Sequence, residues 1–470
     1  MPPWLLDLLY VPLALLYLPV LLYQMIALGK NRRGWRERLG FIRPRADRRP
    51  CVWIHAVSLG EVNAARRLVD EIERRLPDHE VVLSATTDTG HAAARKHYHP
   101  RMVFRYPLDF SGAVRRVLRR VRPSAIVLME LEVWPNLLTL AARAGVPVGV
   151  ANGRVTAERS MRRFGLPLVR GIARRMFGQL AWVAAQNETY AARFRALGVP
   201  AERVRVTGTM KYDTATVADS VPGDAALAVA LGIDRRRPLI VAGSTGPGEE
   251  EMLLEAVERL WREDPAVQLA IVPRKPERFD EVARLIEDRG LACVRRSRCP
   301  DAAAPGGRGE PSPESGEPSR VRRPAADRTG DADGRRRVLL GDTMGELRKF
   351  YALADVAFVG RSLVPMGGSD LMEAAGLGRA VCFGPHVENF AEVAAELIAA
   401  DAAVALGGPA DLLPALRRLL RDRAAAAALG RRAQEVVRRN TGASRRTAEL
   451  LAEALGRGGR GPQPGDLGNA

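Results

Sequence analysis

Short apolar runs alternate with amphipathic segments along most of this chain, and this alternation limits its fold more than any other feature. Residues 51–58 (CVWIHAVS) form an apolar run, and residues 61–76 carry apolar side chains at helical spacing. The same pairing recurs in residues 79–98 and 124–145. Strands that alternate with helices form parallel sheets covered by helices. The sequence therefore predicts an α/β fold of doubly wound, Rossmann-like sheets.

The alternation comes in two series, which predicts two domains. It pauses at residues 213–236, where Asp, Gly and Pro occur without clear periodicity, and it resumes with the apolar run at residues 237–245. A chain of 470 residues is also too long for one ordinary core. We expect one α/β domain over residues 31–215 and another over residues 216–456. Their strand ends are expected to face a shared cleft.

Two segments fall outside this pattern. Residues 297–336 are rich in Pro, Gly, Ser, Asp and Arg, with Val321 as their only large aliphatic residue. This composition predicts a disordered surface insertion in the second domain. Residues 457–470, which are rich in Gly and Pro, are expected to form a disordered tail.

The N-terminal residues 4–28 are almost entirely apolar, with Asp7 and Gln24 as the main polar interruptions. At ~1.5 Å per residue, a helix of this length can cross a bilayer core of ~30 Å. Residues 1–30 are therefore predicted to be a membrane anchor, with a buried core helix as the alternative.

The residues in and around this segment predict its orientation but do not show whether it spans the membrane or lies in the membrane interface. Lys30, Arg32 and Arg33 follow it, which favours a cytoplasmic location for the rest of the chain. Pro12 and Pro19 lie inside it, so it is either a kinked spanning helix or a segment in the membrane interface.

The net charge favours anionic ligands, and the spacing of the cysteines and histidines argues against a metal site. The net charge is +18, which predicts attraction to anionic lipids, phosphorylated substrates or nucleic acid, with a solvated basic surface as the alternative. The four cysteines and six histidines show no zinc or disulfide spacing. We therefore expect no metal site and no cofactor.

In the first domain, polar residues of the types that take part in catalysis follow the predicted strands. Glu61 has the S-x-x-E spacing of a capping box with Ser58. It is either only a helix cap or a general base that accepts a hydroxyl proton. Glu130 and Glu132 end a strand. Two carboxylates beside an apolar run require either hydrogen-bonding partners or a functional role. Lys211 is one of five lysines and is either a surface residue or a group that neutralises phosphate.

In the second domain, loops with phosphate-binding character follow several predicted strands. Arg274 ends a strand, where its guanidinium can hold phosphate bidentately. Residues 341–347 (GDTMGEL) and the glycine-bearing residues 358–376 each precede a predicted helix, the latter beginning near Asp370 with Glu373 in its first turn. Helix N-termini favour anions. Together these loops predict a nucleotide-sugar site.

Seven strings in one order resemble the bacterial Kdo (3-deoxy-D-manno-octulosonic acid) transferases. They are WIHAVSLGEV, MELEVWPN, VTGTMKYD, AGSTGPGEEE, VPRKPERF, GDTMGEL and FGPHVENF. The resemblance implies a GT-B fold and an inverting, metal-independent glycosyltransferase of lipopolysaccharide biosynthesis. Such an enzyme transfers Kdo from CMP-Kdo to a lipid A precursor at the cytoplasmic face of the inner membrane, with no nucleic acid as partner.

The resemblance also implies roles for individual residues. Glu61 matches the catalytic base, and Glu130 and Lys211 match positions thought to stabilise the transition state. The residues that match CMP-contacting segments are Pro273, Arg274, Met344, Gly345, Glu346, Asp370, Leu371, Met372 and Glu373.

The sequence departs from the family pattern around the last of these segments. Ser369 and Asp370 stand where the family usually has His-Asn, and Arg361 stands where many members have glycine. Met366 and Lys275 each stand in place of a histidine.

Three other functions remain open from the sequence. Another GT-B transferase with a different nucleotide sugar would share these loops. A sugar-nucleotide epimerase would share the fold but would not need an apolar anchor. A nonenzymatic, membrane-tethered polyanion-binding protein would account for the charge but not for carboxylates and glycines at strand ends.

Overall fold

The computed structural model describes residues 2–27, 33–156, 160–165, 167–299 and 336–457. The chain forms two compact units, which are described separately. The first comprises Met1–Thr214 with Asn440–Ala470, and the second comprises Ala215–Arg439. Most of the predicted insertion and all but the first residue of the predicted tail lie outside the described residues.

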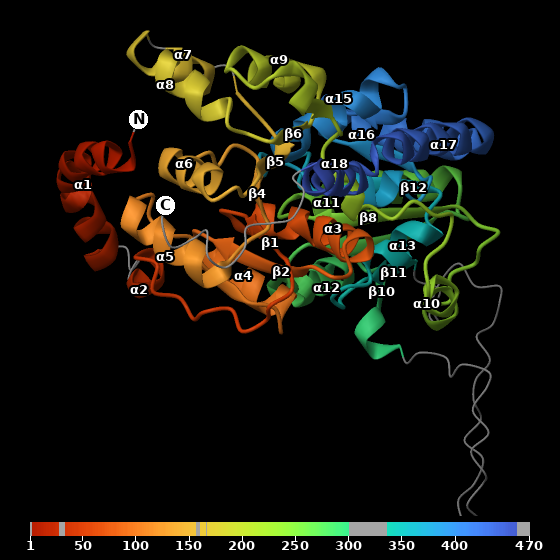
Figure 1. The fold of residues 1–470 in the computed structure, drawn as a ribbon. Coiled ribbons are helices and arrows are strands. Elements are labelled where there is room, and N and C mark those ends of the chain that lie inside the picture. The colour runs from red at the N-terminus through yellow and green to blue at the C-terminus, as the bar shows by residue number, and fades with distance from the viewer. Residues whose placement is uncertain (1, 28–32, 157–159, 166, 300–335, 458–470) are drawn as a thin grey trace, which may run out of the picture. The chain divides into compact units, whose positions relative to one another are not determined.

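The first unit is a parallel sheet of seven strands in the order β3-β2-β1-β4-β5-β6-β7. Its strands are β1 (Cys51–His55), β2 (Glu80–Ala85), β3 (Val103–Arg105), β4 (Ala125–Met129), β5 (Val148–Gly153), β6 (Trp182–Ala185) and β7 (Val204–Val206). Its helices are α1 (Pro3–Ile26), α2 (Trp35–Arg38), α3 (Leu59–Arg75), α4 (Asp88–Tyr98), α5 (Ser111–Val121), α6 (Pro135–Arg143), α7 (Arg162–Gly165), α8 (Pro167–Phe177), α9 (Glu188–Ala196) and α18 (Ala443–Arg457), with 3-10 turns η2 (Ala201–Arg203) and η3 (Tyr212–Thr214). Figure 1 shows the helices around the sheet.

The apolar side chains of this sheet alternate between two cores. Trp53 and Ile126 pack with α5, α6, α8 and α9 on one face. Val52 and Ile54 pack with α3, α4 and α18 on the other. A strand that is buried on both faces reads as a continuous apolar run, which is how residues 51–54 appear in the sequence.

The second unit repeats this plan with seven parallel strands in the order β10-β11-β9-β8-β12-β13-β14. Its strands are β8 (Leu239–Thr245), β9 (Gln268–Pro273), β10 (Ala292–Arg295), β11 (Arg337–Leu340), β12 (Val356–Val359), β13 (Ala380–Phe383) and β14 (Ala403–Ala405). Its helices are α10 (Asp224–Leu231), α11 (Glu249–Glu263), α12 (Phe279–Asp288), α13 (Leu347–Leu353), α14 (Met372–Ala375), α15 (Ala391–Ala399), α16 (Leu412–Arg421) and α17 (Arg423–Asn440), with 3-10 turns η4 (Pro276–Arg278), η5 (Arg296–Arg298), η6 (Glu388–Phe390) and η7 (Pro409–Asp411). The predicted α/β class with two doubly wound sheets is confirmed.

The C-terminal helix α18 belongs to the first unit, whereas the sequence analysis placed residues up to 456 in the second domain. It packs on α3, and its first backbone N–H groups, from Gly442, Ala443 and Ser444, donate to the carboxylate of Asp213. The chain therefore returns to the unit in which it began. An amphipathic pattern shows that a helix has an apolar face but does not show which core buries it.

Helix α10 is a second difference from the sequence analysis, which found no regular element in residues 213–236. Its residues Asp224–Leu231 (DAALAVAL) are apolar all round after the first position. No polar stripe marks a helical period in such a segment, so the periodicity did not reveal it.

Candidate active site

The predicted carboxylates of the first unit lie at one edge of its sheet. β1 and β4 are neighbours, with His55 in register with Leu128, and the strand order reverses between them. Glu61 lies in the first turn of α3, which follows β1, and Glu130 directly follows β4. Ligands of doubly wound sheets bind outside the carboxyl ends of the strands at this reversal. The fold therefore brings Glu61 and Glu130 to the place where a ligand site is expected.

Both carboxylate oxygens of Glu61 accept hydrogen bonds from the turn that begins α3. Oε2 accepts from the Val57 N–H at 2.8 Å, and Oε1 accepts from the Ser58 hydroxyl at 2.9 Å. The Ser58 hydroxyl in turn caps the helix by accepting from the Glu61 N–H. The capping interpretation is therefore correct as geometry, and it also fixes the carboxylate in one orientation at the strand end.

The surroundings of Glu61 suit it for accepting a proton. Burial raises its pKa to about 7, the Val57 N–H opposes this shift, and the negative charges of Glu130 and Glu132 add to it. A general base works best with a pKa near the operating pH. A helix cap alone does not require such a pKa.

Glu130 and Glu132 stand in a loop with a strained start. Glu130 has a left-handed backbone with φ of 57°, which costs energy in a residue other than glycine. Glu132 is half-buried, accepts a hydrogen bond from the Trp134 indole at 3.1 Å, and has a pKa raised by burial. Two residues at the reversal point of the second sheet also have left-handed backbones. Ser244 is the last residue but one of β8, and Arg361 comes two residues after β12. Strain of this kind is concentrated at functional sites.

Lys211 follows the edge strand β7, three strands away from β4. Its loop turns back across the sheet, because the N–H of the neighbouring Met210 donates to the side-chain oxygen of Asn152 in β5. The turn η3 that comes next packs on α3. Lys211 is half-buried there. The loop thus runs toward the helix that carries Glu61.

In the second unit, the sheet order reverses between β8 and β12, and a buried carboxylate joins the loops after these strands. Glu249 is fully buried. Its oxygens accept the N–H groups of Gly246, Arg361, Ser362 and Leu363. One side chain therefore fixes the shape of both loops. The sequence analysis did not single out Glu249, because an acidic residue at a helix start looks like ordinary capping.

Arg274 follows β9 beside the same edge. Its N–H donates to the Thr245 carbonyl at 3.1 Å, and its side chain is exposed. Pro273, which ends β9, is buried and in register with Thr245. The exposed Arg274 side chain therefore lies beside the ends of β8 and β9, and its charge acts on the nearby Asp370.

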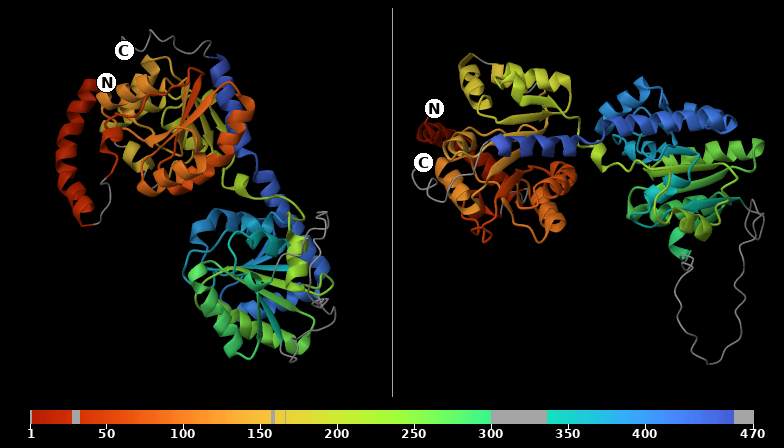
Figure 2. Two further views of the ribbon diagram at one scale, coloured as in Figure 1. Left: turned by 90° about the horizontal axis from the view of Figure 1, so that it is seen from below. Right: turned by 45° about the vertical axis from the view of Figure 1, so that its right-hand side comes forward.

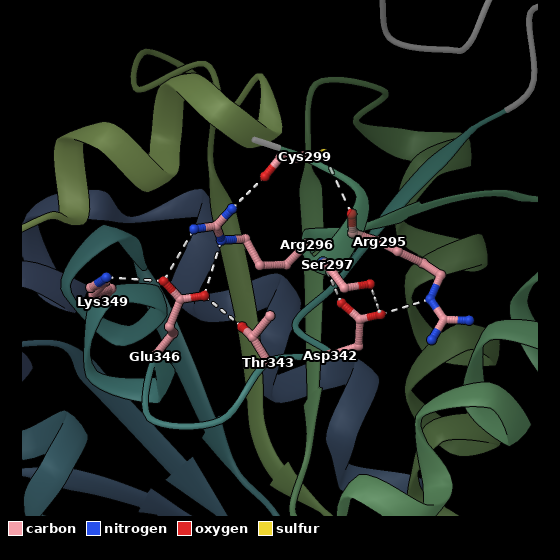
Figure 3. A network of polar contacts seen from close by, with 8 residues as sticks. All are labelled: Arg295, Arg296, Ser297, Cys299, Asp342, Thr343, Glu346 and Lys349. Carbon is pink, nitrogen blue, oxygen red and sulfur yellow. Dashed lines mark hydrogen bonds and ion pairs between the residues drawn. The ribbon is translucent and has the colours of Figure 1, made fainter. Parts of the chain in front are cut away.

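The predicted CMP-contacting loop of residues 341–347 is fixed by an ionic network (Figure 3). Glu346 accepts from the Arg296 guanidinium at 3.0 Å and from the Lys349 ammonium at 2.9 Å. Asp342 accepts from Arg295 at 2.7 Å and from the Ser297 N–H at 2.8 Å. Both acidic side chains are thus occupied by partners from η5 and its neighbours, which the sequence pattern did not reveal. Met344 is exposed at the tip of the loop, and Gly345 has a left-handed backbone.

Glu346→Gln is expected to lower the free energy of unfolding by about 1–3 kcal/mol at neutral pH. Burial alone would raise the pKa of Glu346, but hydrogen bonds from Thr343, Lys349 and Arg296 outweigh burial and lower it from 4.5 to about 2. The charged form therefore stabilises the fold above pH 4.5, and this contribution is lost as the pH falls through about 2. Urea unfolding between pH 7 and pH 3 checks this, and an equal difference between the two proteins at all pH values would contradict it.

The glycine-bearing loop of residues 360–371 follows β12 and leads into a short helix. This helix, α14, is a single turn of four residues that begins at Met372, close to the predicted start near Asp370, and Glu373 lies in its first turn as predicted. The Gly368 N–H donates to the Arg361 carbonyl at 2.8 Å. The Gly368 N–H is therefore used within the loop, and the helix begins after these glycines and not at them. Long stretches of loop with paired N–H groups have no signature in the sequence.

Some of the other residues predicted to contact CMP in this segment are buried. Leu371 and Met372 are buried. Burial and the nearby Glu373 charge raise the pKa of Asp370 to about 6, and its carboxylate accepts the Met372 N–H at 2.9 Å. Glu373 accepts from Arg348 at 3.3 Å.

The structure also reveals a polar cluster that sequence reasoning missed. Asp109 is buried and accepts the N–H groups of Asn136 and Leu137, and it has a pKa raised to about 6 by burial. Asp7 of α1 accepts from the Asn136 amide at 2.9 Å. The MELEVWPN string thus serves partly to hold α6 and α1 in place. Across the described ranges, no group of three or more His, Cys, Asp or Glu residues is arranged to hold a metal ion.

Comparisons with known proteins identify the family. Residues 33–214 match the family model described as 3-deoxy-D-manno-octulosonic-acid transferase (kdotransferase). A 3-deoxy-D-manno-octulosonic acid transferase of Bordetella pertussis is 37% identical over 415 residues, which cover 86% of this chain and 87% of the relative. The chain belongs to the Kdo transferase family. The predicted family, the glycosyltransferase activity and Kdo transfer in lipopolysaccharide biosynthesis are thereby confirmed.

Solved structures place this Kdo transferase among GT-B folds. MurG of Acinetobacter baumannii is 14% identical with a TM-score of 0.51, over 86% of this chain and 99% of that one. A putative UDP-N-acetylglucosamine 2-epimerase of Listeria monocytogenes is 12% identical, also with a TM-score of 0.51, over 88% and 99%. A glycosyltransferase of Rickettsia africae, 10% identical over 87% of this chain and 99% of that one, has the same TM-score of 0.51 as the epimerase, so the fold alone does not choose between these activities. The family does, and it excludes the epimerase.

Proposed function

We propose that this Kdo transferase moves Kdo from CMP-Kdo to the hydroxyl of a lipid A precursor, with Glu61 as the general base. Glu61 takes the acceptor proton while the hydroxyl oxygen bonds to the anomeric carbon. The bond from that carbon to the CMP phosphate breaks, and CMP leaves with the electron pair. The observation that carries this proposal is a carboxylate with a pKa of about 7, held by two hydrogen bonds at the reversal point of the first sheet.

Charge separates in this reaction, and the proposed cationic residues act on it. Positive charge develops on the sugar and negative charge on the departing phosphate. We assign Arg274 and Lys211 to the phosphate, because preorganised cations stabilise charge that develops in a transition state. Glu130 is assigned to the positive charge on the sugar. Pro273, Met344, Gly345 and Glu346 are assigned to the pocket for CMP.

We also propose that the chain is attached to the cytoplasmic face of the inner membrane through α1. This is the one helix of the described residues that is long and apolar enough to cross a membrane, and few of its residues are buried. The net charge of +18 favours an anionic membrane and an anionic acceptor.

Incubation of the purified protein with CMP-Kdo and lipid A precursor, followed by mass spectrometry, tests the donor and the acceptor. The lipid is expected to gain the mass of Kdo while CMP is released in equal amount. CMP is expected to protect the protein against thermal unfolding more than UDP does. Stronger protection by UDP, with no Kdo added to the lipid, would favour a different nucleotide sugar.

The pH dependence of kcat/KM is expected to rise through about pH 7, where Glu61 loses its proton. Glu130→Gln removes a negative charge that raises the pKa of Glu61, so its acid limb is expected at lower pH, whatever the height of its plateau. Initial rates measured from pH 5 to pH 9 for both proteins check this. A limb that stays in place, or moves to higher pH, would contradict the assignment of the limb to Glu61.

A further inference from the structure

Helix α1 combines an apolar surface with an unexpected attachment. All of residues 11–20 are exposed, and Leu16 and Ile26 are 79% and 75% exposed. The helix has 24 residues and is therefore ~36 Å long at ~1.5 Å per residue. Exposed apolar surface of this extent is unfavourable in water. A lipid surface is the partner that fits it.

The first turns of α1 are fixed to the first unit by polar contacts. Pro3 and Leu6 are buried. The Asp7 carboxylate accepts the Ser111 N–H at 2.9 Å, and it also accepts the Ser111 hydroxyl. Tyr10 donates to the Asp109 carboxylate at 3.0 Å, and its ring packs edge-on against Phe110.

These contacts reach the core of the unit. Asp109 is 8% exposed and Asn136 is fully buried. The Asn136 amide donates both to Asp7 and to the Asp109 carbonyl. The start of α1 is thus tied to the loop that begins α6.

The other end of α1 leads back to the same segment. Helix α2 begins at Trp35, eight positions after Ala27, and its Arg38 carbonyl accepts the Leu108 N–H at 2.8 Å. The start of α1 thus contacts residues 109–111, and α2, which follows α1 closely along the chain, contacts residue 108. Figures 1 and 2 show α1 running along the side of the unit past α6 and α5.

A helix that crosses the bilayer needs its two ends on opposite sides of the membrane. For α1, this would break the contacts of Asp7 and Tyr10 with residues 109–111 and carry the Asp7 carboxylate across the hydrocarbon to the far side of the membrane, which is costly. An interfacial position keeps these contacts, immerses the exposed apolar residues in one leaflet, and leaves Asp7 with its partners. The neighbouring helix α5 exposes Arg115 and Arg119, which suits anionic headgroups.

We infer that α1 lies in one leaflet of the membrane and does not span it, so that both of its ends are on the side of the catalytic units. This inference rests on the proposed membrane attachment. It also places the loop that begins α6, and Trp134 with it, beside the surface from which a lipid acceptor arrives.

The test uses sealed inverted inner-membrane vesicles from cells that express the full chain with a cleavable epitope tag at each end. The C-terminal tag is the control for a cytoplasmic location. We expect protease to remove the N-terminal tag as completely as the C-terminal one. An N-terminal tag that is protected until detergent is added would overturn the inference and leave membrane attachment intact. A chain found in the soluble fraction would overturn both.

A second measurement tests the polar attachment itself. Asp7→Ala in detergent is expected to speed proteolysis within residues 2–26, because the first turns lose their contacts with Ser111 and Asn136. Leu8→Ala, at a neighbouring exposed position, is the matched control and is expected to behave as wild type. Equal rates for wild type and Asp7→Ala would contradict the attachment.

Discussion

Glu249→Ala is expected to lower the free energy of unfolding of the second unit by roughly 3–5 kcal/mol. The substitution leaves the N–H groups of Gly246, Arg361, Ser362 and Leu363 without the carboxylate that accepts them. These groups lie around a fully buried side chain, so water does not readily replace it. Thermal unfolding followed by calorimetry checks this.

Two further variants sharpen this prediction. Glu251→Gln, at an exposed position in the same first turn of α11, is expected to change stability by no more than about 0.5 kcal/mol. Glu249→Gln keeps the shape of the side chain but turns an amide NH2 group toward backbone donors, and it is expected to be nearly as destabilising as alanine. A Glu249→Gln variant as stable as the wild type would show that its acceptor role is unimportant.

Glu61→Gln is expected to lower kcat by roughly 10²–10⁴-fold, which is the usual contribution of general-base catalysis. Glutamine cannot take the acceptor proton, but its oxygen can accept from the Val57 N–H while its NH2 group donates to the Ser58 hydroxyl, so the turn is retained. Glu249 differs, because its partners are N–H donors. Steady-state release of CMP in the presence of lipid acceptor measures the effect.

The matched control for this substitution is Glu188→Gln. Glu188 lies in the first turn of α9, which follows β6 in the same sheet, and it is exposed beside the Asn187 cap. It is expected to retain wild-type turnover. A similar loss of turnover in both variants would show that removing any carboxylate from a helix start in this sheet has this effect, and would contradict a specific role for Glu61.

The sequence predicts the layers of this fold well because burial on both faces of a parallel sheet leaves a strong local pattern. Apolar runs such as residues 51–54 and 239–242 are strands, and each is followed by an amphipathic segment that forms a helix. Patterning fails where the information is not local. Residues 224–231 show no polar stripe, and the residues that follow 440 give no sign of the unit to which they return.

The candidate site divides in the same way. Glu61 and Glu130 were found because both follow apolar runs, and the strand order then places them together. The role of Glu249 depends on donors more than 100 positions away, and that of Glu346 depends on Arg296, 50 positions away. Arg361 stands where the resemblance predicts glycine, and its φ of 60° is a backbone conformation that glycine adopts without strain.

The central claim is that Glu61 takes the acceptor proton in the transfer step, and a single-turnover experiment tests it most directly. Enzyme loaded with CMP-Kdo is mixed with lipid A precursor, and Kdo-lipid is quantified over time for wild type and Glu61→Gln. The account predicts equal affinity for CMP-Kdo and a transfer rate that falls by roughly 10²-fold or more. Transfer by Glu61→Gln at the wild-type rate would contradict it.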